Sequence, residues 1–244
     1  MTSRAEFLGS IRAEMAKTPG AFKASPAVRP QRPAEMAETI RRELAERWPQ
    51  ALERFRAEFE RVGGVFYRVA TAKDVPAVIA TIARDRGATR MVAWPPSALG
   101  FDGDLAAHGV ETRAMPPGEL PDDERQQLRD LIAKADLGLT GVDLAIAETG
   151  SLVFRSGPGR PRSTSLLPPY HVAVFDRTAL VESLAQVGVF LEAWHDGASE
   201  AWRGGVINFI TGPSRTADIE LTLTRGVHGP KEVHAIFAEG GLGG

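Results

Sequence analysis

The feature that most constrains this chain is the alternation of short β-rich runs with helical runs from residue 65 onward. The β-rich or apolar runs lie at 65–70, 89–94, 110–115, 144–147, 151–155, 171–175, 206–210 and 232–237. Helical patterns lie between several of them, at 74–86, 104–108, 121–135 and 178–194. Strands that alternate with helices favour a sheet with both faces covered. The sequence therefore predicts an α/β fold.

A helical extension precedes this region. Ser3 and Glu6 have the spacing of a capping box. The apolar residues that follow share one helical face: Phe7, Leu8, Ile11 and Met15. Four prolines between residues 18 and 33 predict an extended linker. The apolar face of such a helix can pack on its own domain, on a second copy or on another protein.

Residues 34–62 carry apolar side chains at intervals of three or four, which predicts a long helix that is kinked or divided at Pro49. Gly63 and Gly64 end it. The predicted division of the chain is therefore an amphipathic helix with a Pro-rich linker at 1–33, an α/β domain at 34–240 and a Gly-rich tail at 241–244.

Composition excludes several classes of protein. The formal net charge is −2, and no basic stripe with interleaved aromatic residues is present, so the sequence does not favour nucleic-acid binding. The absence of cysteine excludes disulfides, cysteine catalysis and an iron–sulfur cluster held by the chain's own thiolates. No apolar run has the length of a signal-peptide core or a membrane span. These features predict a cytoplasmic protein.

Common catalytic and cofactor motifs are missing from the sequence. It contains neither the G-x-G-x-x-G dinucleotide fingerprint nor a P-loop. The five histidines form no H-E-x-x-H pair, and no G-x-S-x-G nucleophile elbow occurs. We therefore predict no metal site and no cofactor on this chain.

Three polar loops remain as candidates for a site. The first contains Glu148, Thr149 and Gly150 and follows an apolar run. Glu148 could bind a ligand hydroxyl, act as a base or nucleophile, or cap neighbouring amides. The alternative is a tight turn in which Gly150 supplies a positive φ.

The second loop spans residues 155–169, where arginines alternate with hydroxyl residues. Arg162 and Ser163 are the binding candidates, because guanidinium groups and hydroxyls suit carboxylate or phosphate. The alternative is an exposed hairpin tip whose charges are only solvated.

The third loop lies at 210–220 and is followed by a rigid turn at 226–230. Glycine allows close approach of the backbone, arginine offers a bidentate cation, and the acids and the histidine can take part in acid–base chemistry. The candidate ligand-binding residues are Gly212, Pro213, Ser214, Arg215, Thr216, Asp218 and Gly229, and the catalytic candidates besides Glu148 are Glu220 and His228. The acids could instead complement a helix N-terminus. Because loops at strand ends can converge, we expect a shared site.

Four segments carry a family resemblance: "GVDLAIAETGSLVF" at 141–154, "LPPYHVAVFD" at 167–176, "FITGPSRTADIE" at 209–220 and "GVHGPKEVHAIF" at 226–237. Together they closely resemble the LUD-domain family, in its lactate utilization protein C branch. The resemblance implies a three-layer α/β/α sandwich similar to the NagB/RpiA/CoA-transferase fold. It also implies a role in bacterial growth on L-lactate beside partner proteins that carry iron–sulfur clusters. It supplies no catalytic set, and "GPGRPRSTS" at 157–165 departs from the family pattern.

Three hypotheses follow. The first is a cysteine-free subunit of a system that oxidises L-lactate to pyruvate. The second is a stand-alone enzyme of the CoA-transferase or isomerase kind, with Glu148 or Glu220 as nucleophile or base and Arg215 holding an anionic group. The third is a regulatory module that binds a small carboxylate, a nucleotide or a CoA-type ligand.

Overall fold

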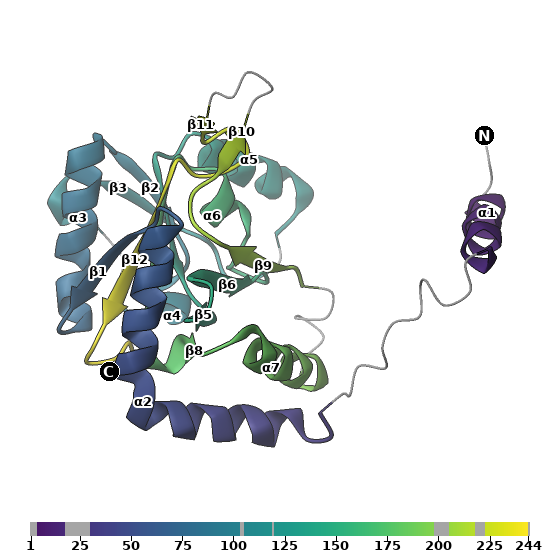
Figure 1. Cartoon of the computed structure of the whole chain (residues 1–244). Coiled ribbons are helices and arrows are strands. Elements are labelled where there is room, and N and C mark those ends of the chain that lie inside the picture. Colours follow the sequence, from purple (N-terminus) through teal and green to yellow (C-terminus); the bar gives the residue numbers. More distant parts are fainter. Residues whose placement is uncertain are drawn as a thin grey trace. The chain divides into compact units, whose positions relative to one another are not determined.

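The computed structural model in Figure 1 describes residues 4–17, 30–102, 105–118, 120–197, 205–217 and 223–243. The chain divides into two compact units, Met1–Gln31 and Arg32–Gly244. The first unit contains helix α1 (Arg4–Ala16), where the sequence predicts a helix. Ser3 of the expected capping box lies outside the described residues. The second unit contains all the other elements.

The second unit is built on a six-stranded sheet with the order β1-β12-β7-β4-β2-β3. All neighbouring pairs in this sheet are parallel. Its strands are β1 (Val65–Val69), β2 (Arg90–Ala93), β3 (Glu111–Ala114), β4 (Leu137–Gly141), β7 (Tyr170–Phe175) and β12 (Glu232–Ala238). The predicted α/β class is thereby confirmed.

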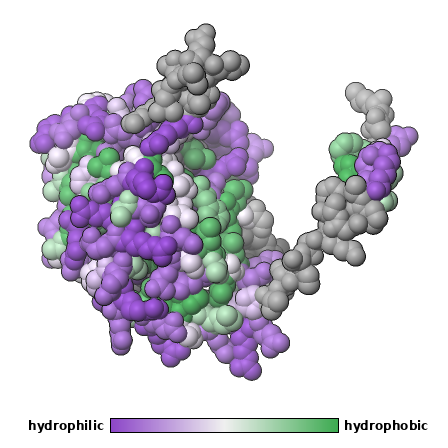
Figure 2. Space-filling view, viewed as in Figure 1, coloured by the Kyte–Doolittle hydropathy of each residue, from purple (hydrophilic) through white to green (hydrophobic). Residues whose placement is uncertain are grey.

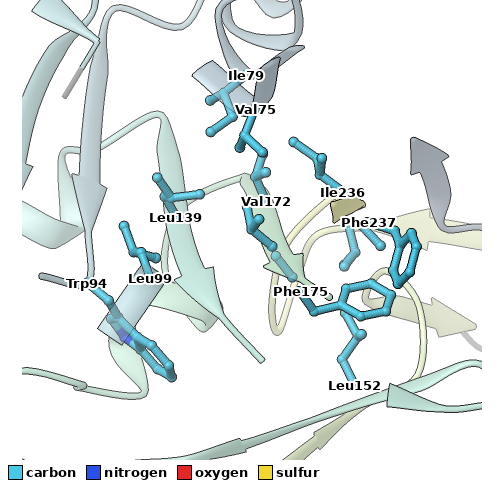
Figure 3. Packing of buried hydrophobic residues seen from close by; sticks show 14 of the residues in the cluster. Val75, Ile79, Trp94, Leu99, Leu139, Leu152, Val172, Phe175, Ile236 and Phe237 are labelled. Carbon is cyan, nitrogen blue, oxygen red and sulfur yellow. The ribbon is translucent and has the colours of Figure 1, made fainter. Parts of the chain in front are cut away.

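The two faces of this sheet are covered differently. Helix α3 (Val75–Arg86) lies on one face, where Figure 3 shows Val75 near Val172 and Ile236. Helix α2 (Pro33–Arg61) covers the other face, where Trp48 stacks on Phe237 with ring centroids 5.6 Å apart. Successive residues of a strand point to opposite faces, so the neighbours Ile236 and Phe237 belong to different layers.

A second sheet lies on the α2 side and has the order β8-β5-β6-β9. Its strands are β8 (Leu180–Val181), β5 (Leu144–Ile146), β6 (Ser151–Arg155) and β9 (Ile207–Ile210). Leu152 and Phe154 join the main core, whereas Val153 joins a smaller cluster with Val187 and Phe190. Both faces of the hairpin β5–β6 are therefore buried. The sequence indicates β5, β6 and β9 but predicts neither β8 nor a separate sheet.

The smaller cluster packs under helix α7 (Leu184–Asp196). The sequence predicts one helix over 178–194, but the structure has a 3-10 turn η3 (Arg177–Ala179), then β8, then α7. Helix α7 begins at Leu184 because Ser183 is its N-cap, and its Oγ accepts a hydrogen bond from the Gln186 amide at 3.4 Å. The apolar run before Ser183 pairs with β5 instead of continuing the helix.

Helix α2 runs unbroken through Pro49, and Figure 1 shows that it bends. Proline removes a backbone donor and clashes with the preceding turn, which accounts for a bend in a helix of 29 residues. The first part of α2 packs against α7, and Phe55 and Phe59 beyond Pro49 are fully buried against the main sheet. One helix thus belongs to both hydrophobic clusters.

The remaining elements are short or peripheral. They are η1 (Ala72–Asp74), α4 (Pro96–Leu99), η2 (Ala106–His108), α5 (Asp122–Ala133), α6 (Ser163–Leu166), β10 (Arg215–Ala217) and β11 (Leu223–Arg225). Within the described residues, no helix combines the length and apolar character needed to cross a membrane.

A buried histidine of the main sheet makes the free energy of unfolding depend on pH. His171 on β7 is fully buried, and its Nε2 lies 2.9 Å from Thr140 Oγ1. Burial, with a smaller effect of His234, lowers the pKa of His171 to about 3. In the unfolded chain the pKa of histidine is about 6.5. As the pH falls below that value, the unfolded state binds the proton first and is favoured.

We therefore expect the free energy of unfolding to fall between pH 6.5 and 3, with His171 contributing up to about 1.4 kcal/mol per pH unit. Urea titrations at several pH values measure this slope. His171→Gln removes the titrating group. The variant is expected to lose nearly the whole contribution of one proton to the slope, about 1.4 kcal/mol per pH unit. An unchanged slope in that variant would contradict the assignment.

Candidate functional site

The first and third polar loops meet through a chain of hydroxyl groups. Thr149 Oγ1 donates to Ser151 Oγ at 2.8 Å, and Ser151 Oγ lies 2.7 Å from Thr211 Oγ1. Thr211 directly precedes Gly212, so this chain ties the β5–β6 turn to the third loop. Two loops separated by about sixty residues in sequence are thus neighbours in space.

In the first loop, Glu148 acts as a helix cap. Its Oε2 accepts a hydrogen bond from the Leu184 amide at 2.9 Å, at the first turn of α7. A carboxylate there complements the positive end of the helix dipole. Gly150 has φ +63°, and a Cβ on it would lie 2.7 Å from Phe59 Cα. Glycine therefore lets this turn approach the backbone of α2 closely.

The third loop contacts the end of the same helix. Arg215 Nη2 donates to the Val62 carbonyl at 2.5 Å, which satisfies one of the last carbonyls of α2. Gly212 has φ +76°, and a Cβ on it would lie 2.6 Å from the same carbonyl oxygen. Pro213 is buried. The loop that the sequence singles out is therefore packed on the C-terminal end of α2.

The turn at 226–230 joins this arrangement. The Ser214 amide donates to the Pro230 carbonyl at 2.9 Å, and the Ser214 carbonyl accepts from the Gly226 amide at 3.1 Å. A Cβ on Gly229 would lie 3.3 Å from Ser214 Cβ. His228 is exposed in this turn. The first loop, the third loop and this turn thus form one continuous polar surface around the end of α2, called the α2-end surface below.

The last three candidates of the third loop are not seen at the α2-end surface. Thr216 lies on β10, where it pairs with Thr224 of β11. Asp218 and Glu220 lie outside the described residues. The catalytic roles of Glu148, Glu220 and His228 stay predictions.

Arg162 and Ser163 of the middle loop lie elsewhere, in a groove between α5 and α6 with a volume of about 860 Å³. Within the part of the chain that the structure describes, no hydrogen bond or ion pair links their side chains to the α2-end surface. The lining residues are Arg125, Leu128, Arg129, Asp130, Ile132, Ala133, Ser156, Pro161, Arg162, Ser163, Leu166, Leu167 and Val206. This α5–α6 groove combines an apolar floor with arginines and hydroxyls.

A buried ionic cluster supports the wall of the groove. The Asp143 carboxylate accepts hydrogen bonds from the Arg155 amide at 2.7 Å, Arg155 Nε at 3.1 Å and Arg160 Nη2 at 2.5 Å. The Arg160 guanidinium stacks on Trp94 and the Arg155 guanidinium on Trp194, each 4.3 Å from the ring centroid. Burial lowers the pKa of Arg160, an effect that the negative charge of Asp143 opposes. Asp143 thus holds two stacked cations.

This cluster connects directly to groove residues. Trp94 Nε1 donates to the carbonyl of Pro161 at 3.5 Å, and the Ser156 amide, next to Arg155, donates to Val206 at 2.8 Å. Sequence patterns do not single out Asp143. The available signal was a carboxylate inside the otherwise apolar "GVDLAIA" stretch.

No group of three or more histidine, cysteine, aspartate or glutamate side chains in the described ranges is arranged to hold a metal ion.

Comparison with known proteins shows related sequences and one related fold. The LUD domain family model matches residues 52–238. Lactate utilization protein C of Halalkalibacterium halodurans is 43% identical over 116 residues, which is 48% of this chain and 50% of that protein. The same-named protein of Exiguobacterium sp. is 39% identical over 109 residues, covering 45% and 46%. The chain therefore spans about half the length of these curated relatives.

A crystal structure of a DUF162 family protein from Deinococcus radiodurans superimposes with a TM-score of 0.53. The match covers 78% of this chain and 97% of that chain, at 20% sequence identity. At this identity the likeness supports the fold and nothing further.

Proposed function

The chain belongs to the LUD-domain family, and from this membership we propose that it is a component of a bacterial L-lactate utilization system. In this proposal it is the cysteine-free partner of iron–sulfur proteins that oxidise L-lactate to pyruvate in the cytoplasm. The observation that carries the proposal is the 43% identity over 116 residues to Lactate utilization protein C of H. halodurans.

The chemistry of the reaction supports a division of labour between subunits. Oxidation of lactate to pyruvate releases two electrons and two protons, so a redox group must accept the electrons. Cysteine thiolates are the usual ligands of iron–sulfur clusters, and this chain has none. The clusters are therefore assigned to the partners. This chain contributes a binding surface, for which the α2-end surface is the candidate.

Deletion of the gene tests this role. Loss of the protein is expected to abolish growth on L-lactate as sole carbon source and to leave growth on another carbon source unchanged. Expression of the intact chain is expected to restore growth. If the deletion strain grows on L-lactate at the parental rate, the proposed function is wrong.

Purification of the tagged protein under anaerobic conditions, from lactate-grown cells, tests the partners separately. The expected eluate contains stoichiometric partner proteins and the brown absorbance of iron–sulfur clusters. Because this chain has no cysteine, we expect the chromophore to arrive with a partner. A colourless protein that elutes alone, both with and without cross-linking, would contradict stable or transient assembly.

A further inference from the structure

The α5–α6 groove is much larger than lactate. Its volume is about 860 Å³, within the range of roughly 300–1,000 Å³ seen for sites that hold drug-sized ligands. Lactate has six heavy atoms. Even if each took the roughly 30 Å³ of a liquid water molecule, lactate would occupy at most about 180 Å³. The groove therefore has room for a ligand with several times the volume of a three-carbon acid.

The floor of the groove is apolar and partly open to solvent. Ile132 is buried, Leu128 and Leu166 are half-buried, and Leu167 and Val206 are 52% and 43% exposed. Isolated exposed apolar residues are ordinary, but here they line one concave surface. Such a floor favours an apolar body in the ligand.

The polar groups of the groove are mainly hydrogen-bond donors. Neither Arg129 nor Arg162 has a hydrogen bond or ion pair from its guanidinium among the described residues. The lining contains three arginines and one aspartate, Asp130, which gives it two net positive charges. Arg125 is also paired with Asp122 outside the lining, at 3.8 Å. Asp130 Oδ1 is already engaged, because it accepts from Gln126 Nε2 at 3.1 Å.

Two serine hydroxyls add to this set. Ser156 Oγ accepts from Asn208 Nδ2 at 3.1 Å, which leaves its proton available to a ligand acceptor. Ser163 lies at the start of α6 and lines the same groove. Guanidinium groups and hydroxyls together select a carboxylate or a phosphate.

We propose that the α5–α6 groove binds an elongated ligand with an apolar body and one anionic end, a carboxylate or a phosphate. Arg129 and Arg162 bind the anionic end, and the floor around Leu128, Ile132 and Leu166 binds the apolar body. This site is additional to the proposed role in lactate utilization and does not depend on it.

A chain-length series tests the apolar part. The full-length protein is titrated by calorimetry with lactate, butyrate, hexanoate, octanoate and decanoate. Each buried methylene is expected to strengthen binding about fourfold, until the chain fills the groove. Lactate is expected to show no saturable binding where decanoate binds with one-to-one stoichiometry. Equal affinities along the series would overturn the proposal.

Substitutions test the anionic part. Arg129→Ala and Arg162→Ala are each expected to weaken decanoate binding about tenfold or more, because each removes a charge-assisted contact. Arg84→Ala, which changes an exposed arginine on α3, is the matched control and is expected to bind like the wild type. Leu167→Ser is expected to reduce the gain in affinity for each added methylene of the ligand. Thermal unfolding checks that each variant folds, and Arg129→Gln or Arg162→Gln replaces the corresponding alanine variant if it does not.

A parallel titration with decyl phosphate identifies which anionic group of the ligand the groove prefers. Tighter binding of decyl phosphate than of decanoate assigns a phosphate, and the reverse assigns a carboxylate. Decanoate binding that is unchanged when both arginines are replaced, or that occurs at many equivalent sites, would overturn the proposal whatever the outcome of the growth experiments.

Discussion

Replacing Asp143 by alanine is expected to lower the free energy of unfolding by about 3 kcal/mol or more. The side chain is only 8% exposed and accepts three hydrogen bonds from Arg155 and Arg160. Without the carboxylate, the two stacked guanidinium groups lose the largely buried acceptor that they share. Removal of one partner of a buried ion pair typically costs about 3–5 kcal/mol, and the partial exposure of Arg155 places the effect at the lower end.

Urea titration of the wild type and of Asp143→Ala at neutral pH measures this effect. Asp85→Ala is the matched control, because Asp85 pairs with Arg84 on the surface, where both side chains are at least half exposed. That pair contributes at most about 1 kcal/mol. If the two variants lose the same stability, Asp143 does not anchor the cluster as described.

Replacing Phe55 by alanine is expected to cost about 3–5 kcal/mol of unfolding free energy. Phe55 is fully buried and its ring contacts the rings of Phe59, Phe66 and Phe175, with centroids 5.4, 6.2 and 5.3 Å away. The truncation removes apolar burial and leaves a cavity between α2 and the main sheet. The cost depends on how far α2 can move to fill it.

Phe209→Ala is the comparison for this second variant, since Phe209 on β9 is 46% exposed. Its loss is expected to be about 1 kcal/mol or less, because little burial is removed. Figure 2 shows exposed hydrophobic residues in the region of β9 and α7. A larger loss at Phe209 than at Phe55 would mean that the packing between α2 and the sheet is not the main stabilising contact.

The sequence predicts most of the fold but not strand β4, although β4 is fully buried at the centre of the sheet. Its sequence, LGLTG, contains two glycines, and Thr140 is its one β-branched residue, so it lacks the run of β-branched and aromatic side chains that indicates a strand. The structure explains the glycines. A Cβ on Gly138 would collide with the Thr164 carbonyl of α6, and one on Gly141 would lie 2.6 Å from the Ala98 carbonyl. Such approaches depend on distant segments and leave no local pattern.

The candidate site shows the same limit. Residue types identify the polar loops, but the partners of those residues lie far away in the chain. Arg215 bonds to Val62, 153 residues earlier, and Glu148 caps a helix that begins 36 residues later. Composition alone cannot distinguish an arginine that binds a helix carbonyl from one that faces a ligand. The α5–α6 groove could not be predicted from the sequence either, because Arg129 and Arg162 come from different elements.

The place of β12 in the main sheet has a consequence for how the protein folds during synthesis. Among the described residues β12 is the last strand in chain order, yet it pairs with both β1 and β7. Until residues 232–238 leave the ribosome, β1 has no neighbour in the sheet and β7 presents an open edge. Unpaired edges of nascent sheets are prone to wrong pairing. The main sheet therefore closes between β1 and β7 only after β12 has been synthesised, and these two strands are exposed to wrong pairing until then.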